Sequence, residues 1–382
     1  MSSEVSYSKE PHRNSRFTIN SKEPFNAEPP VSELTKSFVT PNDLFFVRNH
    51  APVPDVCLDT FRLTISGLVQ QPLTFSLTQL QDGFRKVTVM ATLMCAGNRR
   101  TELHNIQPVR GVGWGAAAIS NAVWGGVSLR DVLLAAGVGP YARNMHVAFE
   151  GLDHANGAPY GGSIPIEKAM DVNGAVVLAY EMNGETLPRD HGYPLRVVIP
   201  GYIGARSVKW LSSVIVQKEE SSNFFQRKDY KVFLPQVTWD TVKSLWDATP
   251  ALLELNVQAA ITYPEDGTVI ENGLPCSIQG YAIAGGGRRI SRVDVSIDGG
   301  KSWNVAPMVQ EKGSTSTGNH HWSWTLWIYK VDQLPTPCEI VCRAWDTAFN
   351  GMQSEREWNL RGVMHNSWFK VKVLPAEHAS KL

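Results

Sequence analysis

The sequence has few cysteines, no excess of either charge and no long apolar run. Its five cysteines form no Cys-x-x-Cys pair, which excludes a disulfide framework and the usual zinc and thioredoxin motifs and fits a reducing compartment. Lys and Arg together number 36, as do Asp and Glu, so no binding to nucleic acid or to an anionic membrane is expected. No apolar run approaches the roughly 18 residues of a membrane span. The first 30 residues lack the apolar core of a signal peptide, so we expect a protein that is neither secreted nor inserted in a membrane.

The first half of the chain mixes strand-like runs with helix-like stretches. Strands are predicted over residues 61–67, 146–151, 175–182 and 195–200. The strongest helix runs over 128–137, where Ser128 is a suitable N-cap and Gly137 a suitable end. No GxGxxG motif follows a strand, so a Rossmann-type dinucleotide site is not expected. This half of the sequence predicts an α+β domain, which we place at residues 1–245.

The second half changes to strands with a period of two residues, typical of a β-sandwich. Trp322, Trp324 and Leu326 alternate on one face of a predicted strand, and we expect them to be buried core residues. Residues 237–250 are predicted to be the linker, and the sandwich domain is placed at 246–378 with a tail at 379–382. The predicted strands cover 255–262, 275–284, 289–297, 303–308, 322–329, 338–345 and 368–374.

Cys95 differs from the other cysteines because of its neighbours. It ends the apolar run MATLM and is followed by Gly97-Asn98, which predicts a turn that leaves the cysteine at a strand end. Arg99 and Arg100 could supply the positive field that favours a thiolate. A thiolate suits a thiophilic metal, but this stretch offers only one protein ligand. We therefore expect a bound cofactor to complete the coordination of any metal at Cys95.

Other basic residues recur in turn-rich stretches. Arg48 lies in FVRNH, and Arg196 follows Asp190-His191-Gly192. The sequence GARSVK resembles a phosphate cradle, because backbone N–H groups, the hydroxyl of Ser207 and the ammonium of Lys209 could all face an anion. A structural ion pair is the alternative for each arginine. The ten histidines include no HxH or HExxH, and no GxSxG elbow occurs, so neither a zinc hydrolase nor an α/β-hydrolase is indicated.

These motifs together resemble the sulfite oxidase family, whose molybdenum-cofactor enzymes share Cys-Ala-Gly-Asn-Arg-Arg with eukaryotic nitrate reductases. The resemblance runs from KEPFNAEPP through FFVRNH, CAGNRR, VRGVGWG, RDHGYPLRV and PGYIGARSVKWL to WNLRGV, which is nearly the whole chain. It implies a molybdopterin-binding α+β domain followed by an immunoglobulin-like dimerisation domain, and hence a homodimer.

The resemblance also implies a role for individual residues. Cys95 would be the thiolate ligand of molybdenum. Arg110 stands where some relatives have lysine. The family's pterin-binding positions match Phe46, Val47, Arg48, Asn49, His50, Asp153, His191, Arg196, Ser207, Val208 and Lys209, and its substrate pocket matches Arg48, Arg100, Trp114, Tyr230 and Arg361. The chemistry agrees, because sulfite is a small dianion that guanidinium groups bind well.

The family divides by the way electrons leave the metal. Animal members carry a haem domain, whereas plant members lack it and reside in peroxisomes. This sequence holds no His-Pro-Gly-Gly haem motif and ends in Ser380-Lys381-Leu382, the tripeptide read by the peroxisomal import receptor. The expectation is therefore a haem-free peroxisomal sulfite oxidase that reduces oxygen to hydrogen peroxide. The alternatives are a nitrate reductase domain, a sulfite dehydrogenase with a separate electron acceptor, and a non-catalytic protein that keeps the fold.

Overall fold

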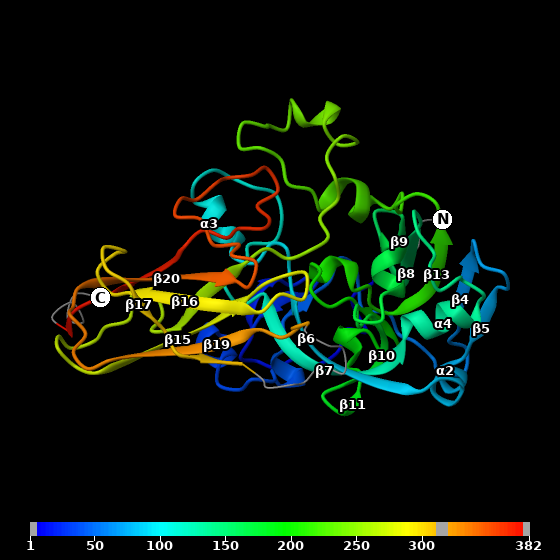
Figure 1. Ribbon diagram of the computed structural model, residues 1–382, viewed down its shortest axis with the longest axis horizontal. Coiled ribbons are helices and arrows are strands. Elements are labelled where there is room, and N and C mark those ends of the chain that lie inside the picture. The colour runs from blue at the N-terminus through cyan, green and yellow to red at the C-terminus, as the bar shows by residue number, and fades with distance from the viewer. Residues whose placement is uncertain (1–5, 311–319, 377–382) are drawn as a thin grey trace.

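The computed structural model describes residues 6–310 and 320–376, so the predicted tail at 379–382 lies outside the described residues. Figure 1 shows the sandwich strands gathered at one end of an elongated molecule and the mixed domain at the other. In the described ranges no helix is long and apolar enough to cross a membrane.

The mixed domain is built on antiparallel sheets, with one parallel pair between β4 and β13. A small sheet contains β1 (Thr18–Ser21), β2 (Asn26–Glu28) and β3 (Val47–Arg48). A second has the order β11-β10-β7-β6, with β12 also paired to β10. A third has the order β5-β4-β13-β8-β9. The strands of these two larger sheets are β4 (Leu63–Gly67), β5 (Leu73–Phe75), β6 (Lys86–Met94), β7 (Ile119–Ser128), β8 (His146–Ala155), β9 (Ala158–Pro165), β10 (Val177–Met182), β11 (Glu185–Thr186), β12 (Arg196–Val198) and β13 (Leu211–Gln217).

The helices of this domain are short and close the gaps between the sheets. The predicted helix is α4, and Ser128 caps it by accepting the backbone N–H of Asp131 at 3.4 Å. Gly137 follows it in the left-handed region, with φ +82°, as predicted for a helix end. The helical segments are α1 (Val31–Leu34), η1 (Asn42–Leu44), α2 (Leu77–Gly83), α3 (Arg100–His104), α4 (Leu129–Ala135), α5 (Ile166–Met170), η2 (Arg189–His191), η3 (Gly204–Arg206), the π-helical η4 (Phe225–Asp229) and η5 (Val242–Ser244).

The second domain is the predicted β-sandwich, with its sheets in the orders β14-β15-β19-β18 and β17-β16-β20-β21. One predicted strand, 303–308, is wrong, because the chain here forms two short strands that join different sheets. Pro307 lies between them and has no N–H to continue a ladder. The strands are β14 (Gln258–Tyr263), β15 (Cys276–Ile283), β16 (Ile290–Ser296), β17 (Asn304–Val305), β18 (Met308–Val309), β19 (Thr325–Val331), β20 (Cys338–Asp346) and β21 (Phe369–Val373).

Trp322 and Trp324 are buried, as expected for core residues, although the core that they fill is not that of the sandwich. Both precede β19 and pack against the core of the first domain, where Trp324 donates its indole N–H to the Phe38 carbonyl at 3.0 Å. Thr92 of β6 donates its backbone N–H to the Trp322 carbonyl at 3.0 Å. Trp327 takes the place in the sandwich core instead. The alternation of apolar residues predicts a buried face, but not which of two cores buries it.

The segment predicted as a linker, 237–250, also contributes to packing between the domains. Val237 and Val242 form an apolar cluster with Leu103 of α3 and with Trp358 and Leu360, which precede β21. The two domains therefore share a packed boundary.

Candidate functional site

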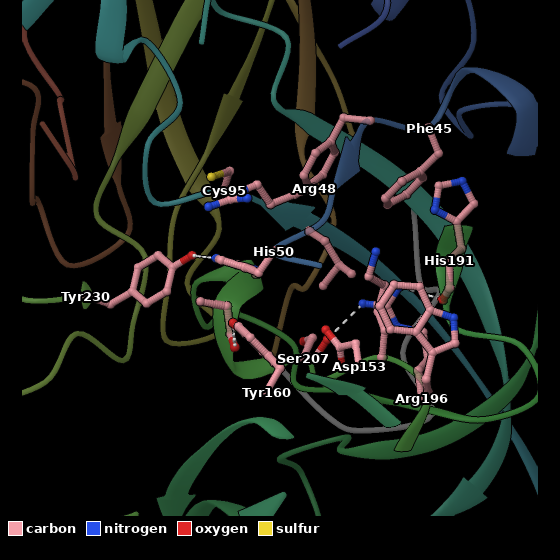
Figure 2. A pocket seen from close by; sticks show the side chains of 16 residues that line it. Phe45, Arg48, His50, Cys95, Asp153, Tyr160, His191, Arg196, Ser207 and Tyr230 are labelled. Atoms are coloured by element: carbon pink, nitrogen blue, oxygen red, sulfur yellow. Dashed lines mark hydrogen bonds between the residues drawn. The ribbon is translucent and has the colours of Figure 1, made fainter. Parts of the chain in front are cut away.

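A cavity lies in the first domain, close to its boundary with the sandwich. Figure 2 shows Cys95, Arg48, His50 and Tyr230 toward one side of it, and Asp153, His191 and Arg196 toward the other. The lining residues are Phe45, Phe46, Arg48, His50, Leu93, Cys95, Asp153, Tyr160, His191, Arg196, Gly204, Ala205, Ser207, Lys209, Trp210 and Tyr230.

Cys95 lines the cavity at the end of β6, as the Gly-Asn turn predicts. Its backbone N–H donates to the Ala118 carbonyl at 2.9 Å, and its carbonyl accepts the Asn98 N–H at 2.9 Å to close the turn. The N–H of Gly97 lies 3.4 Å from Cys95 Sγ. This N–H points toward the sulfur and helps to fix its position at the cavity wall.

Arg100 is fixed in place by backbone groups on several sides. It donates from Nε to the Gly362 carbonyl at 3.0 Å and from Nη1 to the Val112 carbonyl at 2.8 Å. A Cβ on Gly97 would lie 2.5 Å from its Cζ, and one on Gly111 would lie 2.8 Å from its Nη1. Burial lowers the pKa of Arg100, and the neighbouring Cys95 thiol acts in the opposite direction. A guanidinium is thus held close to the cysteine by residues that leave it little space.

Arg99 does not supply the positive field predicted for it. Its side chain is fully buried and binds Glu102 through Nε at 2.7 Å and through Nη2 at 2.9 Å. Its Nη1 donates to the carbonyl of Ser367 in the second domain at 2.7 Å. The charge of Arg99 is therefore neutralised on the side away from the cavity, and Arg100 alone of the two acts on Cys95.

The second domain anchors the turn that follows Cys95. Met364 donates its backbone N–H to the Ala96 carbonyl at 2.7 Å. Asn98 donates its side-chain amide to the Tyr281 hydroxyl at 2.9 Å and accepts the Ala118 N–H at 3.1 Å. The geometry of the cysteine turn thus depends on the sandwich domain as well as on β6.

The predicted substrate residues gather around the Cys95 side of the cavity. Arg48 lines the cavity and donates to the Asn26 side-chain oxygen at 3.0 Å. Tyr230 lines it too, and its hydroxyl lies 3.0 Å from His50 Nε2. Burial raises the pKa of Tyr230, and burial with the charge of Arg48 holds the pKa of His50 well below its usual range. At neutral pH the site therefore contains a neutral phenol against a neutral imidazole.

Arg361 and Trp114 lie behind the cavity wall and do not form part of its lining, and the same is true of Arg100. Arg361 reaches from the second domain to an ion pair with Asp229. Burial lowers its pKa to about 10, with the charges of Arg100, Arg110 and Arg48 acting in the same direction. Trp114 is fully buried with Phe46 and Cys95, and among the described residues its indole N–H has no partner.

At the other side of the cavity, several buried polar groups are left without a partner in the described part of the chain. Asp153 Oδ1 and Arg196 Nε are both in this position. Burial raises the pKa of Asp153 to about 6 and lowers that of Arg196 to about 9 and that of Lys209 to about 7. Buried polar atoms normally have hydrogen-bond partners, so this end of the cavity is suited to a polar ligand with anionic groups.

Some predicted pterin-binding residues do not reach the cavity. Val47 packs beside Phe25, and Val208 packs in the main core, so neither side chain faces a ligand. Asn49 lies behind Lys209 and accepts a hydrogen bond from its ammonium group. These placements follow from strand and turn geometry, in which neighbouring side chains point to opposite sides.

The predicted phosphate cradle is only partly present. The backbone N–H groups of Arg206, Ser207 and Val208 donate within their own turn, so they are not free for an anion. The oxygen of the Ser207 hydroxyl accepts the Ile199 N–H at 3.0 Å, which leaves its proton available to the cavity. Lys209 does line the cavity.

Sequence reasoning missed six lining residues. Tyr160, for example, donates to the Ala205 carbonyl at 2.8 Å and stacks on His50 with ring centroids 4.7 Å apart. Gly204 is closely packed, since a Cβ would lie 3.0 Å from the Met94 carbonyl oxygen. Phe45 could have been found as the neighbour of Phe46, and Gly204 and Ala205 as members of the GARSVK turn, but Leu93, Tyr160 and Trp210 carry no local signal. The six are Phe45, Leu93, Tyr160, Gly204, Ala205 and Trp210.

The donor groups suit a metal that brings most of its own ligands. Within residues 6–310 and 320–376, no three His, Cys, Asp or Glu side chains are grouped to hold a metal ion. Cys95 can supply one soft ligand, and the unpaired Asp153 and Arg196 atoms can bind a polar organic group across the cavity.

Comparisons with known proteins agree with this description. Residues 50–225 match the family described as oxidoreductase molybdopterin binding domain, and residues 249–376 match the Mo-co oxidoreductase dimerisation domain. The chain is 48% identical to the mitochondrial sulfite oxidase of Macaca fascicularis, over 97% of this chain and 68% of that protein. It is 47% identical to the sulfite oxidase of Arabidopsis thaliana, over 96% of this chain and 95% of that protein. The sulfane dehydrogenase SoxCD of Paracoccus pantotrophus is similar in structure, with a TM-score of 0.77 and 26% identity over 94% of this chain and 87% of that one.

Proposed function

This chain belongs to the sulfite oxidase family of molybdopterin-binding oxidoreductases, and from that premise we propose that it oxidises sulfite to sulfate at a molybdenum cofactor. The observation that carries the proposal is the position of Cys95. Its sulfur lines a cavity that has arginine side chains near the cysteine and unpaired polar atoms at the far end. A small oxyanion and a polar cofactor could therefore meet at one sulfur ligand.

The residues present fit the molybdenum cofactor. Cys95 would bind the metal, while Asp153, Arg196 and Lys209 would hold the polar pterin and its anionic phosphate. Once bound, the cofactor supplies the two-electron oxidation and the oxygen-atom transfer that no side chain here can provide. Lys209 would become more fully protonated beside the phosphate, because an adjacent anion favours the charged form.

The protein's own contribution to the reaction is to bind and orient sulfite. Arg48 at the cavity wall, with Arg100 and Arg361 behind it, concentrates positive charge where the dianion must sit. The Tyr230 hydroxyl remains protonated and can turn its proton toward His50 or toward a bound oxyanion. These groups hold the oxygens of sulfite so that its sulfur lone pair faces the metal side of the site.

We further propose that oxygen is the electron acceptor and that the reaction yields sulfate and hydrogen peroxide from sulfite, oxygen and water. The 47% identity to the sulfite oxidase of Arabidopsis thaliana supports an enzyme of the plant type. The Ser380-Lys381-Leu382 sequence supports a peroxisomal location through the import receptor. The dimerisation domain supports a homodimer.

The substrate assignment can be tested with two electron-transfer assays on one preparation whose molybdenum content is known. Sulfate formation from sulfite is followed with ferricyanide as acceptor, and nitrite formation from nitrate is followed with a reduced viologen dye. We expect rapid sulfite oxidation and little nitrate reduction. Efficient nitrate reduction without sulfite oxidation would show that the protein is a nitrate reductase instead. If the Cys95→Ser variant kept its activity, Cys95 would have no role in the reaction.

A further inference from the structure

We propose that Arg13, near the N-terminal end of the described chain, is a positioning residue that holds the cofactor-binding rim of the cavity through Asp190. The inference rests on the proposed function to the extent that the ligand of this rim is the molybdenum cofactor. Arg13 itself does not line the cavity. Arg13 instead contacts Asp190, which lies in the same turn as the cavity residue His191.

The contact between Arg13 and Asp190 is a two-point ion pair. Arg13 Nε lies 2.8 Å from Asp190 Oδ2, and Nη2 lies 2.9 Å from Oδ1. The two side chains are only 12% and 9% exposed, so the pair is largely shielded from water. The guanidinium also stacks over the Phe25 ring, with its carbon 3.9 Å from the ring centroid. A buried bidentate pair of this kind fixes direction as well as charge.

Asp190 in turn positions Lys209, which lines the cavity, both directly and through Asn49. Its backbone carbonyl accepts a hydrogen bond from Lys209 Nζ at 2.7 Å, and its Oδ1 accepts one from the Asn49 amide at 3.2 Å. Asn49 in turn accepts a second hydrogen bond from Lys209 Nζ. Lys209 is therefore held from two directions, and both of its partners depend on where Asp190 lies.

The same turn places two further cavity residues. His191 follows Asp190 directly and is held through Nε2, which lies 3.1 Å from the Asn42 carbonyl oxygen. Trp210 donates its indole N–H to the Arg189 carbonyl at 2.8 Å. His191, Lys209 and Trp210 all line the cavity, so a shift of the Arg189–His191 turn would move three groups that face the ligand.

The residues next to Arg13 in the N-terminal segment make further contacts with the rest of the domain. Glu10 pairs with Arg13 and accepts the Val53 backbone N–H at 2.8 Å. Arg189 donates to the Lys9 carbonyl at 3.0 Å. Residues 9–13 thus form a strap, tied at several points to the turn that bears Asp190. A strap that contacts the rim but not the ligand is expected to control how firmly the cofactor is retained, and to leave the arginines that bind sulfite unaffected.

The test compares the cofactor-loaded wild type with Arg13→Gln and Arg13→Lys. Arg16→Gln is the matched control, because Arg16 is 52% exposed and its only ion pair within the described residues is to Glu33 at 3.5 Å. Pterin and molybdenum released from the folded protein are measured over time at a temperature well below unfolding, and sulfite KM is measured per molybdenum retained. We expect release about tenfold faster in Arg13→Gln, partial recovery in Arg13→Lys, and no change in Arg16→Gln or in KM.

The outcomes separate the two hypotheses. Release from Arg13→Gln at the wild-type rate would overturn the role of the strap while leaving the proposed function intact. A wild-type protein that holds no pterin at all would overturn the proposed function. If Arg13→Gln does not fold, Asp190→Asn supplies the second variant, because it keeps the shape of the side chain and removes the charge that Arg13 binds. Fast release from a folded Asp190→Asn would support the proposal, and wild-type retention would contradict it.

Discussion

Arg100 in the first domain donates its Nε proton to the carbonyl oxygen of Gly362 in the second domain, at 3.0 Å. The guanidinium of Arg100, a charged neighbour of Cys95, is thus held by the sandwich domain. Arg361, next to Gly362 in sequence, reaches back in the same direction and pairs with Asp229. The second domain therefore helps to position the cationic side of the site.

Gly97→Ala tests whether the position of Arg100 matters for substrate binding. The new Cβ would lie 2.5 Å from Arg100 Cζ, so the guanidinium must leave the Gly362 carbonyl. We expect sulfite KM to rise about tenfold, with a smaller effect on stability. The control is Gly113→Ala, whose Cβ would meet only Thr101 Oγ1 at 3.4 Å. Steady-state kinetics and thermal unfolding check both variants, and an unchanged KM in Gly97→Ala would show that Arg100 does not contribute to binding.

Arg361→Gln tests the contribution of the second domain to the oxyanion site. Its pKa is lowered to about 10 by burial and by neighbouring arginines, so its charge lies in a strongly positive and partly desolvated region. Removing that charge should raise sulfite KM by about tenfold or more, because the dianion loses an electrostatic partner. Arg356→Gln is the control, since Arg356 is 41% exposed and pairs with Glu102 at 3.4 Å. Equal KM values for the two variants would contradict the role of Arg361.

Cys95→Ser tests the metal assignment. The hydroxyl is a harder and less basic ligand than a thiolate, so turnover should fall by orders of magnitude. The fold should survive, because serine keeps the backbone hydrogen bonds of residue 95 with Ala118 and Asn98 and has a similarly small side chain. Turnover per molybdenum and the elution volume of the dimer are the measurements. Activity near that of the wild type would remove Cys95 from the coordination of the metal.

Lys209→Met tests the buried ammonium through the pH dependence of stability in the cofactor-free protein. The pKa of Lys209 is lowered by burial from 10.5 to about 7, so between these values the unfolded chain binds more protons than the folded one. The free energy of unfolding should therefore rise with pH across this window, by at most about 1.4 kcal/mol per pH unit for this one group. In Lys209→Met that part of the slope should disappear. Urea unfolding at several pH values measures it, and identical slopes for the two proteins would show that the pKa of Lys209 is not lowered in the folded protein.

The sequence predicts much of the fold because local rules decide it. Ser128 and Gly137 mark the ends of α4, and the alternation of apolar residues finds most strands of the sandwich. It does not identify the core that receives a buried face, so the sequence predicts that Trp322 and Trp324 are buried but not that they pack against the first domain. Packing between domains is a long-range property that a periodic pattern does not encode.

The sequence predicts the site residues that belong to a recognisable motif. It does not predict residues that reach the cavity only through the three-dimensional fold. Cys95, Arg48 and Tyr230 line one cavity as the resemblance implies. Arg99 stands beside Arg100 in the motif, yet it binds Glu102 and Ser367 on the other side of the turn. Adjacent residues in a turn point in different directions. The sequence alone therefore does not show that Arg100 is the charged neighbour of Cys95 and that Arg99 connects the two domains.

The most direct test of the account is the simultaneous measurement of sulfate and hydrogen peroxide formed from sulfite in air, by purified protein of known molybdenum content and without added cytochrome. We expect equal amounts of both products, in proportion to molybdenum, and neither product from Cys95→Ser. Sulfate without peroxide would contradict oxygen as the acceptor. Fully loaded protein that leaves sulfite unchanged would contradict the central claim that this cavity is a sulfite-oxidising site.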